Sequence, residues 1–327
     1  MRGGYRMKGM ELSESFFEKI AKPLFEQELP AFLEAGAFGL VGEGSECFGF
    51  DDEFSRDHDF GAGFCIWLPR EEWKTWLDPV ENVLEKLPSF YQDYPVRMAK
   101  NMRMGRLGPM SVERFYESFI GVKDIPASWQ EWINIPEYFL AVCTNGKIFL
   151  DKMQKFSALR QKLLDFYPKE VRLKKIAARL ANMAQAGQYN AIRSLQREEV
   201  GAVLFSISNF CSAAISLTFL LNKRYMPYYK WAHHAVKMLP VMGSITYSTV
   251  QQLTQIALNQ PQAVDTVFEI IETHCCETRM ALNRLGLTQS NDNWLMSQAH
   301  EIQAQISVPE LRAMSVLQDT LLHVIAH

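Results

Sequence analysis

A stretch between two apolar runs, residues 44–61, constrains the fold of this chain more than any other feature. It reads GSECFGFDDEFSRDHDFG and lies between the runs at 38–41 and 60–68. Short apolar runs bounded by glycine and acidic residues indicate buried strands. We therefore predict a strand, a glycine-serine turn, an acidic loop, and a second strand that opens at residues 57–59.

Alternation along the second predicted strand places two carboxylates on one face. Successive side chains on a strand point to opposite sides of the sheet, so His58 and the apolar residues at even positions share the face that we assign to the core. The other face carries Asp57, Asp59, Gly61 and Gly63. Because glycine has no side chain, we expect bare sheet surface there, on which a ligand can rest. Two carboxylates beside it indicate a Mg²⁺ site shared with substrate phosphates.

The turn at Gly44 and Ser45 forms the second half of this candidate site. A tight turn that opens a helix presents free backbone N–H groups, which favour the anionic oxygens of a phosphate. The serine hydroxyl adds one more donor. We therefore predict that Gly44 and Ser45 hold the phosphates of a nucleotide. An ordinary strand-to-helix turn is the alternative.

These residues resemble the nucleotidyltransferase superfamily of the DNA polymerase beta type. Its signature is a glycine-serine pair after a strand, a short gap, and Asp-x-Asp on the next strand. Within the superfamily, the chain is most similar to bacterial proteins of the DUF4037 family. Three stretches carry this similarity: SRDHDFG at 55–61, GKIFLD at 146–151 and RYMPYYKW at 224–231.

The resemblance implies an enzyme in which a substrate hydroxyl attacks the α-phosphorus of a nucleoside triphosphate bound with Mg²⁺. Asp57 and Asp59 are then the metal ligands, and the acceptor is a small hydroxylated molecule, such as an aminoglycoside, or a macromolecule. Relatives usually carry a third carboxylate on the next strand, but residues 95–102 contain no acid. Asp151 is the best remaining candidate for this third catalytic acid, and its alternative role is a helix N-cap.

The resemblance also implies that the second half of the chain contributes residues that bind the nucleotide. Tyr229 and Lys230 lie in one of the three shared stretches, and Arg193 lies on a predicted helix. We predict that these three side chains contact the triphosphate. The alternatives are a helix start packed by tyrosines and a solvated helix face. The glycine-rich basic segment 102–110 is either a solvated loop or a mobile loop near the phosphates.

The period of the apolar residues divides the chain into two parts. Strand patterns are confined to the first part, whereas later residues repeat apolar side chains at helical spacing. We predict an α+β fold, with an N-terminal nucleotidyltransferase-like α/β domain and a small mixed sheet over 1–151, and a C-terminal all-α helical bundle over 152–327. At 327 residues, 48% of them hydrophobic, the chain is long enough for two cores.

Net charge, cysteine content and one apolar run indicate which partners and which location to expect. A net charge of −3 gives no basic footprint, so nucleic acid is not an expected partner. The six cysteines form no C-x-x-C pair, which favours reduced thiols and a cytoplasmic location. The apolar run 200–221 contains several serines and a threonine, which favours a buried helix over a membrane span.

A non-catalytic protein on the same fold is the competing interpretation. The helix expected around 180–187 reads LANMAQAG and contains no acid that could serve as a base. A chain that kept the metal-binding pair and lost the base would bind a triphosphate with little turnover. Such a chain would be a nucleotide sensor or a protein-interaction module.

Overall fold

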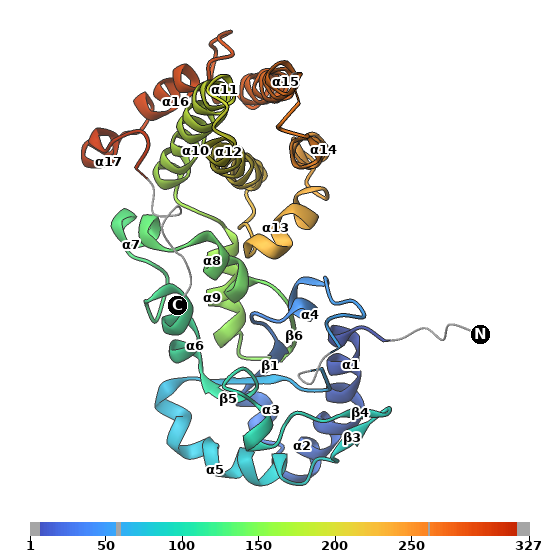
Figure 1. The fold of residues 1–327 in the computed structure, drawn as a ribbon. Helices are drawn as coiled ribbons and strands as arrows, with labels where there is room; N and C mark the ends of the chain where they lie inside the picture. Colours follow the sequence, from blue (N-terminus) through green and yellow to red (C-terminus); the bar gives the residue numbers. More distant parts are fainter. Residues whose placement is uncertain (1–6, 57–59, 261, 319–327) are drawn as a thin grey trace, which may run out of the picture. The chain divides into compact units, whose positions relative to one another are not determined.

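The computed structural model describes residues 7–56, 60–260 and 262–318. It contains both helices and a small sheet, which confirms the predicted α+β class (Figure 1). Its contacts divide the chain into two compact units. Unit 1 comprises Met1–Pro126 and Phe139–Asp165, and unit 2 comprises Ala127–Tyr138 and Phe166–His327. Asp151, where we placed the domain boundary, therefore lies inside unit 1, and the functional division of the chain stays a prediction.

Unit 1 is built on a four-stranded mixed sheet in the order β5-β2-β1-β6. The strands are β1 (Ala37–Leu40), β2 (Cys65–Leu68), β5 (Gly108–Ser111) and β6 (Lys147–Asp151). β1 is antiparallel to both of its neighbours, while β2 and β5 are parallel. A short hairpin, β3 (Phe90–Tyr91) with β4 (Tyr94–Pro95), lies outside this sheet.

The second strand is shorter than we predicted. It begins at Cys65, and before it Ala62 forms an isolated bridge with Val96. Residues 57–59, where we expected the strand to open, lie outside the described residues. The even positions Ala62, Phe64, Ile66 and Leu68 belong to one hydrophobic core, as predicted. The odd positions Cys65 and Trp67 are buried as well, so neither face of β2 is open.

Helices cover both faces of this sheet. They are α1 (Gly9–Phe16), the π-helical turn η1 (Phe17–Ala21), α2 (Lys22–Glu28), α3 (Phe32–Ala35), α4 (Ser45–Phe48), η2 (Arg70–Glu72), α5 (Trp73–Leu84), η3 (Lys100–Met102), α6 (Val112–Ile120), most of α8 (Glu137–Thr144) and α9 (Lys155–Leu164). On one face, Phe17 contacts Phe38 of β1 and Phe64 before β2. On the other, Trp67 of β2 stacks on Phe156 of α9 with the ring centroids 3.9 Å apart.

The described residues of unit 2 form helices joined by turns and loops, with no strand among them. Its elements are α7 (Trp129–Asn134), α10 (Lys169–Met183), the π-helix η4 (Ala184–Ala191), α11 (Ile192–Gln196), α12 (Val200–Leu221), α13 (Tyr229–Val236), α14 (Gly243–Gln255), α15 (Ala263–Arg284), α16 (Leu295–Ala304) and α17 (Pro309–Ala313). α10 and η4 pack beside α12 (Figure 1). A Cβ on Gly187 would overlap the ring of Phe210, so glycine is required for this close approach.

α12 is long and apolar enough to cross a membrane, as its sequence suggested. More than half of its apolar window is buried inside the protein. A buried core helix passes the same test of length and composition, and the packing of α12 against α10, η4 and α14 agrees with that interpretation.

Candidate functional site

The Gly44–Ser45 turn has the local structure that we predicted. It follows β1 and leads into α4, and Gly44 is the extended N-cap residue with φ −63° and ψ 145°. The Asn145 side chain fixes the approach to the turn, because its carboxamide donates to the Gly42 carbonyl at 2.7 Å and accepts from the Gly42 N–H at 3.1 Å. The turn is therefore tied to the segment that precedes β6.

Glu46, which the sequence analysis did not consider, covers this turn. A Cβ on Gly44 would overlap the Glu46 carboxylate, so the acid folds back over the backbone on which we expect a phosphate. Burial raises the pKa of Glu46, and the charge of Asp51 raises it further. A hydrogen bond from its own backbone N–H and the guanidinium groups of Arg97 and Arg106 oppose that rise. Glu46 therefore lies among charges of both signs.

Asp51 is a second buried acid beside the turn. It is 9% exposed, and its Oδ2 accepts a hydrogen bond from the backbone N–H of Gly9 at 2.8 Å. Its Oδ1 is buried and has no hydrogen-bond partner among the described residues. Carboxylate oxygens of this kind are hard ligands suited to Mg²⁺. Within the described ranges, however, no group of three His, Cys, Asp or Glu side chains is placed to hold a metal ion.

Our expectation of bare sheet surface at Gly61 and Gly63 is wrong. A Cβ on Gly61 would overlap the Pro95 carbonyl oxygen, and one on Gly63 would lie 2.6 Å from Cδ1 of Leu107. Pro95 of β4 and Leu107, just before β5, therefore pack directly on these glycines. Their lack of a side chain permits that close backbone packing and leaves no open ligand surface.

The basic segment 102–110 is not a free loop. Arg103 is 8% exposed and forms a bidentate ion pair with Glu81 at 2.7 and 2.8 Å. The segment also enters the sheet as β5. Arg106 is exposed, and its charge lowers the pKa of Glu46.

The predicted metal ligands Asp57 and Asp59 lie outside the described residues, as does His58. Asp151, the candidate third acid, caps a helix: its Oδ2 accepts from the backbone N–H groups of Phe156 at 3.1 Å and Ser157 at 2.8 Å. Asp151 pairs with Ala37 at the start of β1. The Gly44–Ser45 turn follows the other end of that strand, so the sheet register does not bring the turn and Asp151 together.

The three predicted nucleotide contacts in unit 2 lie on exposed helix surface. Tyr229 is 74% exposed and begins α13. The ammonium of Lys230 lies 5.2 Å from the centroid of the Trp231 ring. Arg193 stacks over Tyr189, with its guanidinium 4.6 Å from the ring centroid. No described contact joins any of these three side chains to another of the three.

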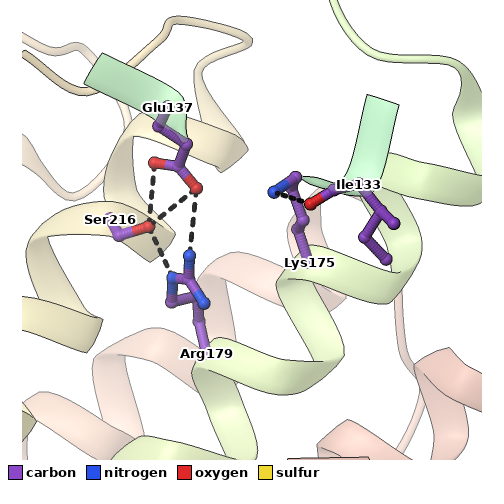
Figure 2. A network of polar contacts seen from close by, with 5 residues as sticks. All are labelled: Ile133, Glu137, Lys175, Arg179 and Ser216. Carbon is purple, nitrogen blue, oxygen red and sulfur yellow. Dashed lines mark hydrogen bonds and ion pairs between the residues drawn. The ribbon is translucent and has the colours of Figure 1, made fainter. Parts of the chain in front are cut away.

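The sequence analysis missed a buried ionic network in unit 2 (Figure 2). Arg179 of α10 pairs with Glu137 at 3.1 Å, and the two side chains are 3% and 1% exposed. The hydroxyl of Ser216 on α12 lies 3.0 and 3.1 Å from the carboxylate oxygens of Glu137, and Arg179 Nε donates to it at 2.6 Å. One turn before Arg179, Lys175 donates to the Ile133 carbonyl at 3.4 Å.

This network joins α10 to α7, to α12 and to Glu137, the first residue of α8. Buried charges are tolerated only when they are paired and hydrogen-bonded. The sequence contains one signal for it, since KEVRLKKIAARL places charged residues at positions that the helical period assigns to the buried face. Nothing in the sequence identifies the partners, which are 42 and 37 residues away.

Comparison with known proteins confirms the resemblance to the DUF4037 family. Residues 132–232 match the family described as "Domain of unknown function (DUF4037)". This part of the chain is therefore similar to that family. The stretches at 146–151 and 224–231 lie within the match, and so do all five residues of the buried network in Figure 2, whereas 55–61 lies before it.

Two further comparisons add little. A search of curated proteins finds no match. Among solved structures, the chain is similar to a nucleotidyltransferase-like protein from Exiguobacterium sibiricum 255-15, with 9% identity and a TM-score of 0.34 over 83% of this chain and 79% of that one. At this TM-score the likeness carries no argument about fold or function.

Proposed function

We propose that this protein is a nucleotidyltransferase that transfers a nucleoside monophosphate from a Mg²⁺-bound nucleoside triphosphate to a hydroxyl group. One observation carries the proposal. Two adjacent antiparallel strands, β1 and β2, flank the segment that contains the Gly44–Ser45 turn, Asp57 and Asp59. This is the arrangement that the superfamily motif requires. The observed turn into α4 supports the phosphate half of the proposed site.

The chemistry assigned to each residue follows from its charge and position. When Mg²⁺ is bound, it neutralises the triphosphate and stabilises the charge on the leaving pyrophosphate. Asp57 and Asp59 are the residues proposed to hold it. The backbone N–H groups after Gly44 and the hydroxyl of Ser45 would donate to phosphate oxygens. Glu46 must rotate away from Gly44 to admit them, and Arg106 is an exposed cation whose charge acts on Glu46.

Binding of ATP, CTP, GTP and UTP tests this proposal. Calorimetric titrations with Mg²⁺ compare wild type, the double variant Asp57→Ala/Asp59→Ala, and Glu53→Ala. Glu53 is an exposed acid of the same loop and serves as the matched control. We expect at least one triphosphate to bind wild type and the control, with loss of binding in the double variant. Equal binding by all three proteins would refute the metal assignment.

A nucleotide sensor is the second candidate, and two observations favour it. Asp151 is engaged as a helix cap, and Glu46 covers the proposed phosphate site. The two hydrogen bonds to Asp151 Oδ2 stabilise the carboxylate form of that residue, which makes it a weaker base for the proton of an attacking hydroxyl. Incubation with α-labelled triphosphates, Mg²⁺ and cell extract separates the two functions. Transfer of label to an acceptor, with release of pyrophosphate, supports the transferase, and tight binding without transfer supports the sensor.

A further inference from the structure

Unit 2 contains a small polar cavity between η4 and α12. Its volume is about 150 Å³. The residues that line it are Asn182, Gln185, Ala186, Asn190, Ser206 and Asn209. Four of these six carry a carboxamide and a fifth carries a hydroxyl, so the lining is polar and uncharged. All six lie within the residues that match DUF4037.

The cavity coincides with a break in regular helical geometry. After Met183, α10 continues as the π-helix η4 over Ala184–Ala191. π-helical turns are rare and occur frequently at functional sites. The side chain of Gln188 points away from the cavity. Its Nε2 donates to the Glu272 carboxylate at 2.9 Å, and its Oε1 accepts from the backbone N–H of Leu295 at 2.9 Å. Gln185 and Asn190 remain on the cavity side.

The cavity presents hydrogen-bonding capacity that the protein does not use. The Nδ2 of Asn182 is buried and has no partner among the described residues. A buried amide donor without a partner costs stability, so it is normally satisfied by protein, water or a ligand. No described hydrogen bond engages the carboxamides of Gln185, which is partly buried, or of Asn190 and Asn209, which are exposed to solvent. Each carboxamide offers two donors and an acceptor.

These groups define the chemistry of the ligand. No charged side chain lines the cavity, so neither a phosphate nor a polycation finds a counter-charge there. No aromatic ring lines it, so a nucleobase finds no stacking surface. Hydroxyl groups both donate and accept, which matches an array of carboxamides. The volume is well above the ~10–15 Å³ that one water needs and below the ~300 Å³ of sites for drug-sized ligands.

We infer that this cavity binds a neutral polyhydroxylated ring, such as one sugar residue or a cyclic polyol. The hydroxyls of the ring exchange hydrogen bonds with the carboxamides of Asn182, Gln185, Asn190 and Asn209, and the buried Nδ2 of Asn182 donates to one of them. This inference does not depend on nucleotidyl transfer, because it concerns only residues of unit 2.

Ligand-observed NMR on the full chain tests the inference with D-glucose, D-galactose, D-mannose and myo-inositol, each titrated in the millimolar range. Adenosine and cytidine form a second arm. We expect saturable binding of at least one sugar or polyol. The variants Asn182→Leu and Asn209→Leu should each weaken it about three- to tenfold, the range for loss of one or two hydrogen bonds. Asn209 is exposed, so its variant is expected to fold normally.

Gln252→Leu is the matched control, because Gln252 is an exposed carboxamide on α14 and does not line the cavity. It should bind like wild type, and circular dichroism checks that each variant is folded. Three results would overturn the inference: no saturable binding by any sugar or polyol, equal binding by wild type and folded Asn209→Leu, or binding of the nucleosides alone. Loss of sugar binding together with normal triphosphate binding in Asn182→Leu would separate this site from the proposed transferase site.

Discussion

Removal of one member of the buried Glu137–Arg179 pair should destabilise the helical unit strongly. The two charges are 3.1 Å apart and almost fully excluded from solvent. At an effective dielectric constant near 20, a pair at this distance attracts by about 5 kcal/mol, and desolvation offsets part of that. Arg179→Met leaves the carboxylate with Ser216 as its hydrogen-bonding partner from this network. We therefore expect a loss of about 3–5 kcal/mol in the free energy of unfolding.

The double variant Glu137→Met/Arg179→Met separates pairing from burial. Because neither charge remains, the cost should be clearly smaller than the sum of the two single variants, with a coupling energy of at least about 2 kcal/mol. Urea unfolding followed by circular dichroism and fluorescence measures all four proteins, and coincidence of the two signals checks that each transition is two-state. Buried charges are little screened by salt, so the effect should persist at 0.5 M NaCl, a concentration at which the Debye length is ~4 Å.

The matched control is the surface pair of Glu18 and Lys22 on the first helices. It lies at 3.1 Å, but its side chains are 44% and 34% exposed. Lys22→Met should therefore cost less than about 0.5 kcal/mol. If the Glu137 and Arg179 single variants were additive in the double variant within about 0.5 kcal/mol, the two charges would not act as a pair and the reasoning would be refuted.

Three further perturbations follow from single residues. Gly187→Ala should lower the free energy of unfolding by about 1–3 kcal/mol, because its Cβ would overlap the Phe210 ring. Gly201→Ala lies on the neighbouring helix with nothing within 4 Å of its Cβ, so it should be neutral or stabilising. Thermal melts of both variants and wild type measure the difference. Burial lowers the pKa of His274 from 6.5 to about 4. The unfolded chain therefore binds the proton at a higher pH than the folded one, and stability should fall as pH drops from 6.5 towards 4. His274→Gln should remove this part of the pH dependence. The raised pKa of Glu46 makes stability depend on pH in the opposite direction, so stability should decline as pH rises above about 4.5. Glu46→Gln should therefore melt at a higher temperature than wild type at pH 7 but not at pH 4.

Each of these tests has an outcome that contradicts it. Equal melting temperatures for the two glycine variants would mean that η4 and α12 can separate without cost. A His274→Gln variant that kept the full acid sensitivity would place its origin in other groups. A Glu46→Gln variant that was less stable than wild type at pH 7 would show that the carboxylate gains more from its neighbours than it loses by burial.

The sequence predicted the frame of unit 1 because alternation and turn chemistry are local signals. Phe64 and Ile66 are in the core where the period of two places them, and the turn at Gly44 opens a helix. The residue at which β2 begins could not be predicted from these signals, because the same residue types occur in an acidic loop and at the end of a strand.

Other features of unit 1 depend on contacts that are distant in sequence. Gly108 and Pro109 indicate a loop, yet β5 pairs with β2 because a parallel neighbour supplies its hydrogen bonds. Arg103 belongs to a glycine-rich basic segment of the kind that binds phosphate, and only the fold reveals that Glu81 neutralises its charge. Gly61 signals a close approach correctly, although the approaching group is the Pro95 backbone and not a ligand.

In unit 2 the sequence predicted helices but not their irregularity. The segment AQAGQYNA reads as ordinary helix, and no residue in it marks a π-turn. Tertiary contacts set that geometry, since Gly187 packs on Phe210 while Gln188 bonds to Glu272. The polar cavity beside it was therefore not predictable from the period of the apolar residues.

Each unit is built from two segments that are separated in the sequence, and this has a consequence for folding during synthesis on the ribosome. Ala127–Tyr138 leaves the ribosome after most of unit 1 but must wait for residues beyond Phe166 to complete its own unit. Until then Glu137 lacks Arg179 and Ser216, the partners that bury it. A fragment that starts at Phe166 would contain Arg179 without Glu137, the carboxylate with which it pairs in the whole chain. Each unit combines two separate segments of the chain, so a cut at Asp151 or Asp165 leaves the segment Ala127–Tyr138 without the rest of its unit.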